Sequence, residues 1–159
     1  MAIDKVRAYF REFGMEEKIQ EFEVSSATVE LAAQAVGVEG ARICKTLSFK
    51  EGEDGCLLIQ TAGDTKIDNR KFKDTFGFKA KMLGHDQTAE MCGHAVGGVC
   101  PFALPENVSV YCDESLKRFE TVFPAAGTSN SAVEMTPDEL FEISGAKDWV
   151  KICDLPAAE

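Results

Sequence analysis

The sequence has no apolar run near the ~20 residues that a membrane-spanning helix needs. Its first segment, MAIDKVRAYFREFG, carries charges throughout and has no continuous apolar stretch, so we expect no secretion signal. None of the six cysteines forms a Cys-x-x-Cys pair, and a disulfide framework is not expected without secretion. These absences together predict a cytoplasmic protein that does not contact a membrane.

Basic residues are the minority, with 17 Lys and Arg against 27 Asp and Glu. The resulting net charge of −10 argues against broad, non-specific binding to DNA or other nucleic acids. The segment from Lys66 to Lys81 is an exception, because six bases and two acids give it a local charge of +4. From charge alone, a solvated helix face is the simpler interpretation of this segment, and contact with a few phosphates is the alternative.

The 159 residues fit one domain, 1–159, within the usual range of roughly 100–200 residues. Helices and strands alternate irregularly, with several connections of hairpin length, which predicts an α/β fold with a mixed sheet rather than a regular parallel one. The hydrophobic periodicity predicts helices over 4–13, 28–37, 68–77 and 87–93 and after Thr136, and strands over 18–24, 41–50, 55–62, 79–83, 108–112, 121–125, 131–135 and 149–153.

Several helix starts are marked by capping residues. Ser25 or Ser26 is expected to cap the second helix, while Asp68 and Asp86 are expected to cap the next two. The clearest start is TPDE at 136–139, where a threonine can cap, a proline occupies the first position and a glutamate can complete a capping box.

A lysine interrupts an apolar strand face in ARICKTLSFK. Strand alternation places Lys45 on one face with Ile43, Leu47 and Phe49, and leaves a mixed, half-exposed face opposite. An unpaired buried ammonium is destabilising by several kcal/mol, on the order of the effective desolvation penalty of an ion. Lys45 is therefore either a functional residue in a pocket, a lysine that extends to solvent near a strand end, or the partner of a buried acid.

The stretch CGHAVGGVCPFALP offers flexible backbone and little side-chain chemistry. Gly97 and Gly98 can expose successive N–H groups, which suit a carbonyl oxygen that becomes negative during acyl transfer. Pro101 would restrict the far side of this loop, although a plain connecting turn has the same composition. A pocket lysine and loop amides supply positive charge and hydrogen-bond donors but no nucleophile, so water would have to attack.

These segments together resemble the YbaK/EbsC-type aminoacyl-tRNA deacylases, a family related to the editing domain of bacterial prolyl-tRNA synthetase. The resemblance extends from about Thr28 to Gly145 and rests on ARICKTLSFK, TAGDTKID, GHAVGGVCPFALP, VYCDESL and SAVEMTPDEL in that order. It implies a mixed, barrel-like sheet flanked by helices. It also implies hydrolysis of the ester that joins a wrong amino acid to tRNA, with no metal or other cofactor.

The resemblance assigns roles to particular residues. Lys45 matches the pocket lysine, and Gly97 to Pro101 match the Gly-x-x-x-Pro loop, with Gly98 and Val99 inside it. Thr46, beside the lysine, and Asn130 and Ser131, where other members carry an acid or a histidine, are expected to bind substrate and to bear on amino-acid choice. Lys66, Arg70, Lys71 and Lys73 are candidate contacts with the tRNA acceptor stem.

The expected substrate is a tRNA charged with a small wrong residue such as alanine, cysteine, serine or threonine. An aminoacyl-tRNA synthetase is a second candidate partner. Two alternatives remain open: a non-catalytic module that binds tRNA or a synthetase, and a thiol or metal protein that uses Cys92, His94 and Cys100, although their spacing matches no zinc pattern. His85 and His94 are isolated, and a local hydrogen-bonding role is expected for each.

Overall fold

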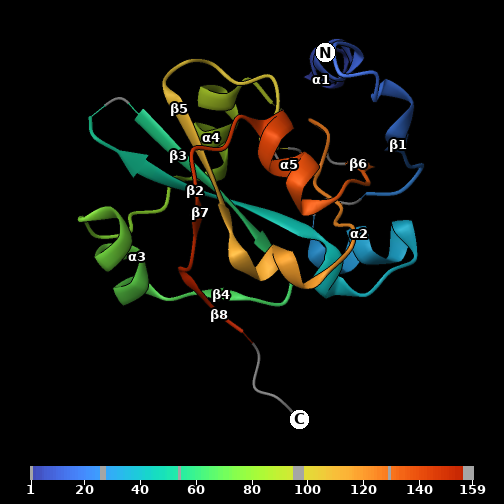
Figure 1. Ribbon diagram of the computed structural model, residues 1–159. Helices are drawn as coiled ribbons and strands as arrows, with labels where there is room; N and C mark the ends of the chain where they lie inside the picture. The colour runs from blue at the N-terminus through green and yellow to red at the C-terminus, as the bar shows by residue number, and fades with distance from the viewer. Residues whose placement is uncertain (1, 26–27, 54, 95–98, 129, 156–159) are drawn as a thin grey trace.

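A mixed four-stranded sheet forms the centre of the computed structural model, which describes residues 2–25, 28–53, 55–94, 99–128 and 130–155 (Figure 1). Strands β2 (Cys44–Glu51) and β3 (Gly55–Ala62) form an antiparallel hairpin. Strand β5 (Val108–Asp113) runs parallel to β3, and β7 (Trp149–Val150) runs parallel to β5. In the order β2-β3-β5-β7, strand β2 lies at one edge.

Two further strand pairs extend the architecture. Strand β1 (Ile19–Glu21) pairs with β6 (Ser131–Val133), and β4 (Lys66–Ile67) pairs with β8 (Cys153–Asp154), both antiparallel. Single bridges, Ile43 to Phe123 and Val122 to Met135, connect the edge of β2 to β6. Within the described ranges, no pairing closes these strands into a complete barrel.

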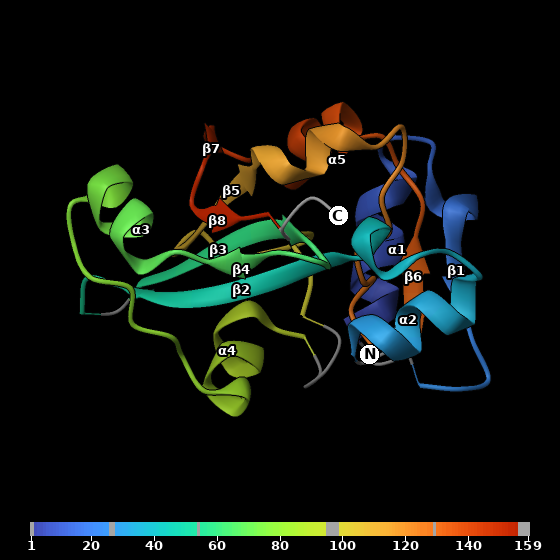
Figure 2. The ribbon, with the colours of Figure 1, turned by 90° about the horizontal axis from the view of Figure 1, so that it is seen from below.

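Helices cover both faces of the central sheet, as expected (Figure 2). Alternate side chains of β3 explain the two layers, because Leu57 and Ile59 pack with Phe72 while Cys56 and Leu58 pack with Cys92. The α-helices are α1 (Ala2–Arg11), α2 (Val29–Val36), α3 (Asn69–Phe76), α4 (His85–Cys92) and α5 (Pro137–Ser144), and short 3₁₀ turns span Glu16–Lys18, Gly40–Arg42 and Glu114–Arg118. No helix in the described part of the chain is long and apolar enough to cross a membrane.

The predicted helix starts are partly right. Thr136 forms the complete capping box with Glu139, and the Asp68 side chain accepts hydrogen bonds at the start of α3. The cap of α2 is Thr28 rather than Ser25 or Ser26, because the helix begins at Val29, later than a cap at either serine requires. At α4 the N-cap position belongs to Gly84 rather than to Asp86.

Several predicted strands are shorter than the sequence pattern indicated, and 18–24 and 131–135 are reduced to β1 and β6. The segments 79–83 and 121–125 contribute isolated bridges only. The segment 149–153 divides into β7 and β8, because the chain turns from β5 toward β4 at Ile152. The N–H of Ile152 donates to Asp113 Oδ2 at 2.9 Å, and its carbonyl accepts from the N–H of Asp68 at 2.7 Å. The predicted α/β fold with a mixed sheet between helices is confirmed.

Candidate active site

A cavity of about 300 Å³ lies along the outer edge of β2. One wall comes from the start of α2, with Thr28, Val29 and Ala32, and another from the segment that carries Phe123 and Ala125. The remaining wall is formed by Met82, Leu83, Thr88 and Val99, and the floor by residues 43–48 of β2. The lining is mostly apolar, so each polar group on the floor is a candidate for substrate recognition.

Gly63 fixes the α2 wall against the end of β3. A Cβ atom added at Gly63 would lie 2.1 Å from the carbonyl oxygen of Gly40 and 2.9 Å from Cγ1 of Val29. Real Cβ atoms do not approach other heavy atoms so closely, so this position accepts glycine alone without a shift of the backbone. The glycine of TAGDT therefore helps to set where Val29 stands in the cavity wall.

Lys45 lines this cavity and is half-buried, as strand alternation predicted. Its side chain lies on the sheet face of Leu47 and Phe49, and its ammonium donates a hydrogen bond to the main-chain carbonyl of Thr65. Among the described residues, no carboxylate forms an ion pair with Lys45. An ammonium has three donors, so two remain available for a ligand.

Asp64 lies next to the carbonyl that holds Lys45 but is engaged elsewhere. The Arg118 guanidinium donates to both of its oxygens, at 2.6 and 3.1 Å. These hydrogen bonds lower the pKa of the Asp64 carboxyl, with a smaller contribution from the charge of Lys45. The acid thus stays ionised and paired with Arg118, and the lysine is the uncompensated charge of the cavity.

Thr46 presents unpaired main-chain groups at the open edge of β2. The N–H groups of Cys44 and Lys50 and the carbonyl of Ser48 all point away from β3, and bond to Phe123, Lys81 and Leu83, respectively. Because alternate residues of a strand point to the same side, the N–H and carbonyl of Thr46 point outward as well. No hydrogen bond from another described residue reaches them, so they are free to bind a ligand.

The face of β2 opposite Lys45 is partly exposed, as expected, because Thr46 is half-buried and Lys50 is exposed, whereas the other two residues are buried. Cys44 and Ser48 are 6% and 8% exposed, because the core and α4 cover them. The Ser48 hydroxyl bonds to that of Thr88 at 2.8 Å, and Thr88 donates to the carbonyl of Gly84. Burial raises the pKa of the Cys44 thiol well above its usual value, so this cysteine is no nucleophile at neutral pH.

The structure describes only part of the predicted glycine loop. Gly97 and Gly98 lie outside the described residues. Val99, which follows them, lines the cavity together with Lys45 and Thr46. Pro101 is buried and does not contribute to the cavity lining.

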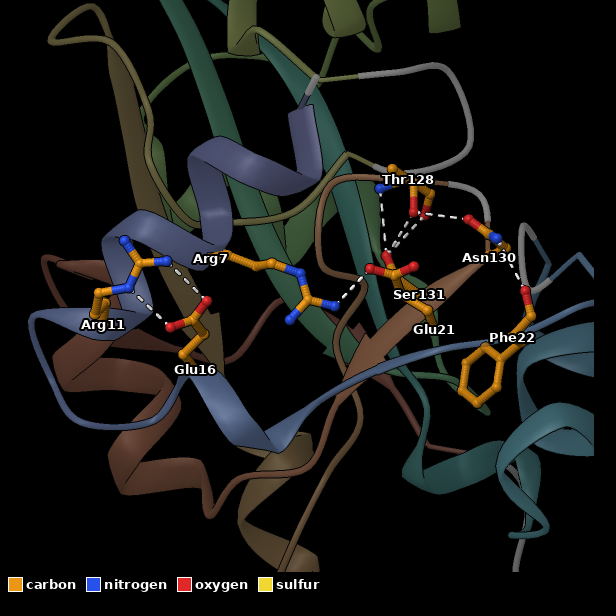
Figure 3. A network of polar contacts seen from close by, with 8 residues as sticks. All are labelled: Arg7, Arg11, Glu16, Glu21, Phe22, Thr128, Asn130 and Ser131. Carbon is orange, nitrogen blue, oxygen red and sulfur yellow. Dashed lines mark hydrogen bonds and ion pairs between the residues drawn. The ribbon is translucent and has the colours of Figure 1, made fainter.

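Ser131 and Asn130 differ in position although they are neighbours in the sequence. Ser131 lines the cavity, and its hydroxyl is hydrogen-bonded to that of Thr128 at 2.8 Å (Figure 3). Asn130 lies outside the lining, and its amide donates to the carbonyl of Phe22 at 2.9 Å. Figure 3 shows that this contact ties the segment before β6 to the end of β1. The structure therefore brings together Lys45, Thr46, Val99 and Ser131.

A family model described as "Aminoacyl-tRNA editing domain" matches residues 23–143, a range that contains all of these cavity residues. The chain belongs to this family. The sequence resemblance to YbaK/EbsC-type proteins is thereby confirmed, and the editing domain occupies most of the chain.

Two relatives and one solved structure are similar to most of this chain. The chain is 52% identical to the uncharacterized protein YwhH of Bacillus subtilis, covering 96% of this chain and 98% of that one. It is 22% identical to EbsC of Enterococcus faecalis, named as a proposed Cys-tRNA(Pro)/Cys-tRNA(Cys) deacylase, over 76% and 74% of the two chains. A crystal structure of a proposed trans-editing enzyme for prolyl-tRNA synthetase superposes with a TM-score of 0.84 at 30% identity, covering 96% and 97%.

The candidate tRNA contacts lie beside the sheet on and before α3. Lys66 belongs to β4, while Arg70, Lys71 and Lys73 belong to α3, and all four side chains are exposed. Lys71 is partly neutralised, because its ammonium lies 2.9 Å from Asp154 Oδ1. Helix α3 packs on the sheet face of Leu57 and Ile59, opposite α4 (Figure 2). Strand alternation assigns Lys45 to this same face, with Leu47 and Phe49.

The thiol or metal alternative gains no support from the editing domain's geometry. In the described ranges, no three His, Cys, Asp or Glu side chains gather closely enough to hold a metal ion. His94 is buried, and its Nε2 lies 2.8 Å from the carbonyl of Phe102 and 3.5 Å from Cys100 Sγ. Burial lowers the pKa of His94 and raises that of Cys100 to about 12, so both groups are neutral at pH 7.

The sequence reasoning missed two residues of the site. Thr65 contributes the carbonyl that holds Lys45, and Gln60 forms a buried hydrogen-bond pair with Thr46. Gln60 carried a signal, because it is the long polar residue in the otherwise apolar strand GCLLIQTA. Thr65 could not be identified from the sequence, because every residue has a main-chain carbonyl.

Proposed function

We propose that this protein is a trans-editing hydrolase that removes a small wrong amino acid, such as alanine, cysteine, serine or threonine, from mischarged tRNA. Membership of an aminoacyl-tRNA editing family supports aminoacyl-tRNA as the substrate and deacylation as the reaction. The observation that carries the proposal is the pairing of Lys45 with the open main chain of Thr46 on the floor of one cavity.

Lys45 binds the acceptor end of the tRNA. Its ammonium is held by one carbonyl and has no acidic partner among the described residues, so its remaining donors serve a ribose oxygen or a phosphate. The half-buried position strengthens this interaction relative to one in bulk water. The lysine thereby fixes where the ester lies on the cavity floor.

The ester carbonyl is held by main-chain donors. The amides of Gly97 and Gly98 supply donors from the loop, as the sequence predicts, and Val99 brings the end of that loop to the cavity wall. The outward-pointing N–H of Thr46 adds a donor from the cavity floor. Donors that are in place before the reaction stabilise the oxyanion that forms when water attacks.

Water is the nucleophile in this mechanism. The nearest thiol, that of Cys44, is protonated, and the Ser48 and Thr88 hydroxyls are engaged with each other and with Gly84. The attack of water on the ester carbonyl breaks the bond to the ribose oxygen, and releases the free amino acid and the uncharged tRNA. Binding and orientation by Lys45 and the amides are the protein's contribution.

The cavity wall selects a small side chain. Val29, Ala32, Phe123 and Ala125 leave about 300 Å³ for the amino acid and the ribose together. Ser131 is the polar group of this wall, and we assign it, with the more distant Asn130, to the choice among small residues. An apolar wall discriminates by only about 10–200-fold per methylene, so we expect a preference rather than absolute specificity.

A panel of tRNAs mischarged with alanine, cysteine, serine, threonine and a large residue tests the proposal. We expect hydrolysis of at least one small aminoacyl-tRNA and little of the large one. Catalysed hydrolysis of none of them, in the presence and absence of a prolyl-tRNA synthetase, would overturn the proposal. Tight tRNA binding without turnover would instead identify a non-catalytic module on the same scaffold.

A further inference from the structure

Gln60 is completely buried behind the cavity floor, where its side chain connects two residues of β2. Its exposure is 0%, and it stands directly across from Thr46 in the antiparallel pairing. The Cys44 thiol lies 2.9 Å from Gln60 Oε1, and Gln60 Nε2 lies 2.9 Å from the Thr46 hydroxyl oxygen. Both strand neighbours line the cavity, whereas Gln60 does not.

The thiol decides which way the amide faces. A cysteine S–H is a donor, so it favours the amide oxygen as its neighbour and turns the NH₂ group toward Thr46. The opposite orientation would place the NH₂ group against the thiol. The hydrogen bond that the Thr46 hydroxyl donates to Gln60 Oε1, at 3.2 Å, is longer than the 2.9 Å bond that it accepts from Nε2, in agreement with this orientation.

The direction of this hydrogen bond determines what Thr46 offers to a ligand. While its oxygen accepts from Gln60 Nε2, its own O–H donates to Gln60 Oε1 across the longer distance of 3.2 Å, and a ligand in the cavity can take over this donor. The other hydroxyls of the floor are engaged, because Ser48 bonds to Thr88 and Thr88 donates to Gly84. Thr46 is thus the floor hydroxyl with the longest donor bond, 3.2 Å, and it lies next to its own outward-pointing main-chain N–H.

We infer that Gln60 is a positioning residue, which orients the Thr46 hydroxyl as a further donor to the ester carbonyl oxygen of the substrate. This inference rests on the proposed deacylase function. The Cys44 thiol sets the orientation of the Gln60 amide, and this amide sets the orientation of the Thr46 hydroxyl. Thr46 then contacts the substrate. The hydroxyl bond strengthens as negative charge develops on the carbonyl oxygen, so its effect falls on kcat rather than on KM.

Single-turnover and steady-state deacylation of the best tRNA from the panel test the role of Thr46. Thr46→Val keeps the shape and removes the hydroxyl, and we expect kcat to fall by about 10²-fold with KM nearly unchanged. Thr46→Ser keeps the hydroxyl and is expected to retain most of kcat. Ser109→Ala, which removes a buried strand hydroxyl outside the cavity, is the control for a purely structural effect.

A double-mutant cycle tests whether Gln60 acts through Thr46. We expect Gln60→Met to lower kcat about tenfold in the wild-type background and not at all in the Thr46→Val background. If Gln60→Met does not fold, Cys44→Ala serves the same cycle, with an expected loss of about threefold. Equal losses in both backgrounds, or an active Thr46→Val with full kcat, would overturn this inference alone. A wild-type protein that hydrolyses no aminoacyl-tRNA would overturn the proposed function itself.

Discussion

The ammonium of Lys45 on β2 donates a hydrogen bond to the main-chain carbonyl of Thr65, twenty residues later in the chain. The carbonyl belongs to the turn TAGDT at the end of β3, and the Thr65 hydroxyl bonds back to the carbonyl of Ala62 at 2.8 Å. This hydrogen bond within the turn stabilises its conformation. The turn holds the lysine beside the cavity through a neutral carbonyl, while the carboxylate of the same turn, Asp64, is paired with Arg118.

Gly63→Ala should destabilise the fold and weaken the site together. The added Cβ would lie 2.1 Å from the Gly40 carbonyl, so the backbone near α2 must move, at a cost of about 1–3 kcal/mol in the free energy of unfolding. Urea denaturation measures this loss. Gly84→Ala is the matched control, because its Cβ meets nothing within 4 Å, and a similar loss there would contradict the proposed close contact.

The Asp64–Arg118 pair predicts a loss of stability in acid. The folded-state pKa of Asp64 is lowered from 3.8, so the unfolded chain binds the proton more readily. The stabilisation is complete above pH ~5 and is lost as the pH falls through 3.8 toward the lower folded pKa. The free energy of unfolding should be measured between pH 6 and pH 3. Over this range it should fall less steeply in Asp64→Asn than in the wild type. Identical slopes for the two proteins would count against this pairing.

The basic segment predicts a salt-dependent contribution to tRNA binding. Replacing Lys66, Arg70 and Lys73 with alanine should raise KM and leave kcat unchanged, because these exposed residues lie outside the cavity lining. The slope of log KM against log salt should fall by about 1 for each phosphate contact removed. Lys71→Ala should have a smaller effect, since Asp154 already pairs with it. An unchanged slope in the triple variant assigns the segment to a merely solvated helix face.

The apolar wall predicts how selectivity can be changed. Ala125→Leu places a larger side chain in the cavity wall, so hydrolysis of threonyl-tRNA should fall about tenfold more than hydrolysis of alanyl-tRNA. Competition between the two substrates in one reaction measures this ratio directly. Equal losses for both substrates would show that this wall does not contact the amino-acid side chain.

Local patterns in the sequence predicted much of the fold. The alternation in ARICKTLSFK placed Lys45 on an apolar face, and the TPDE segment predicted the capping box at Thr136, because both features depend on neighbouring residues alone. Short strands were predicted less well. Val122 and Phe123 have strand-like composition but form single bridges, since the pairing partner rather than the composition decides whether a strand extends.

Contacts between distant segments could not be read from the sequence. The carbonyl of Thr65, the outer edge of β2 and the bond from Gln60 to Thr46 all depend on which strands become neighbours. Asn130 shows the same limit, because it adjoins Ser131 in the sequence but its amide bonds to Phe22. The amino-acid type of Asn130 did not show whether it lines the cavity.

The deacylation rate of Lys45→Ala tests the central claim most directly. Lys50→Ala is its matched control, because that lysine is exposed on the same strand and lies outside the cavity. On the best substrate of the panel, we predict that Lys45→Ala loses about 10²-fold or more in kcat/KM, while Lys50→Ala stays within about twofold of the wild type. A folded Lys45→Ala protein with wild-type kcat/KM would contradict the account.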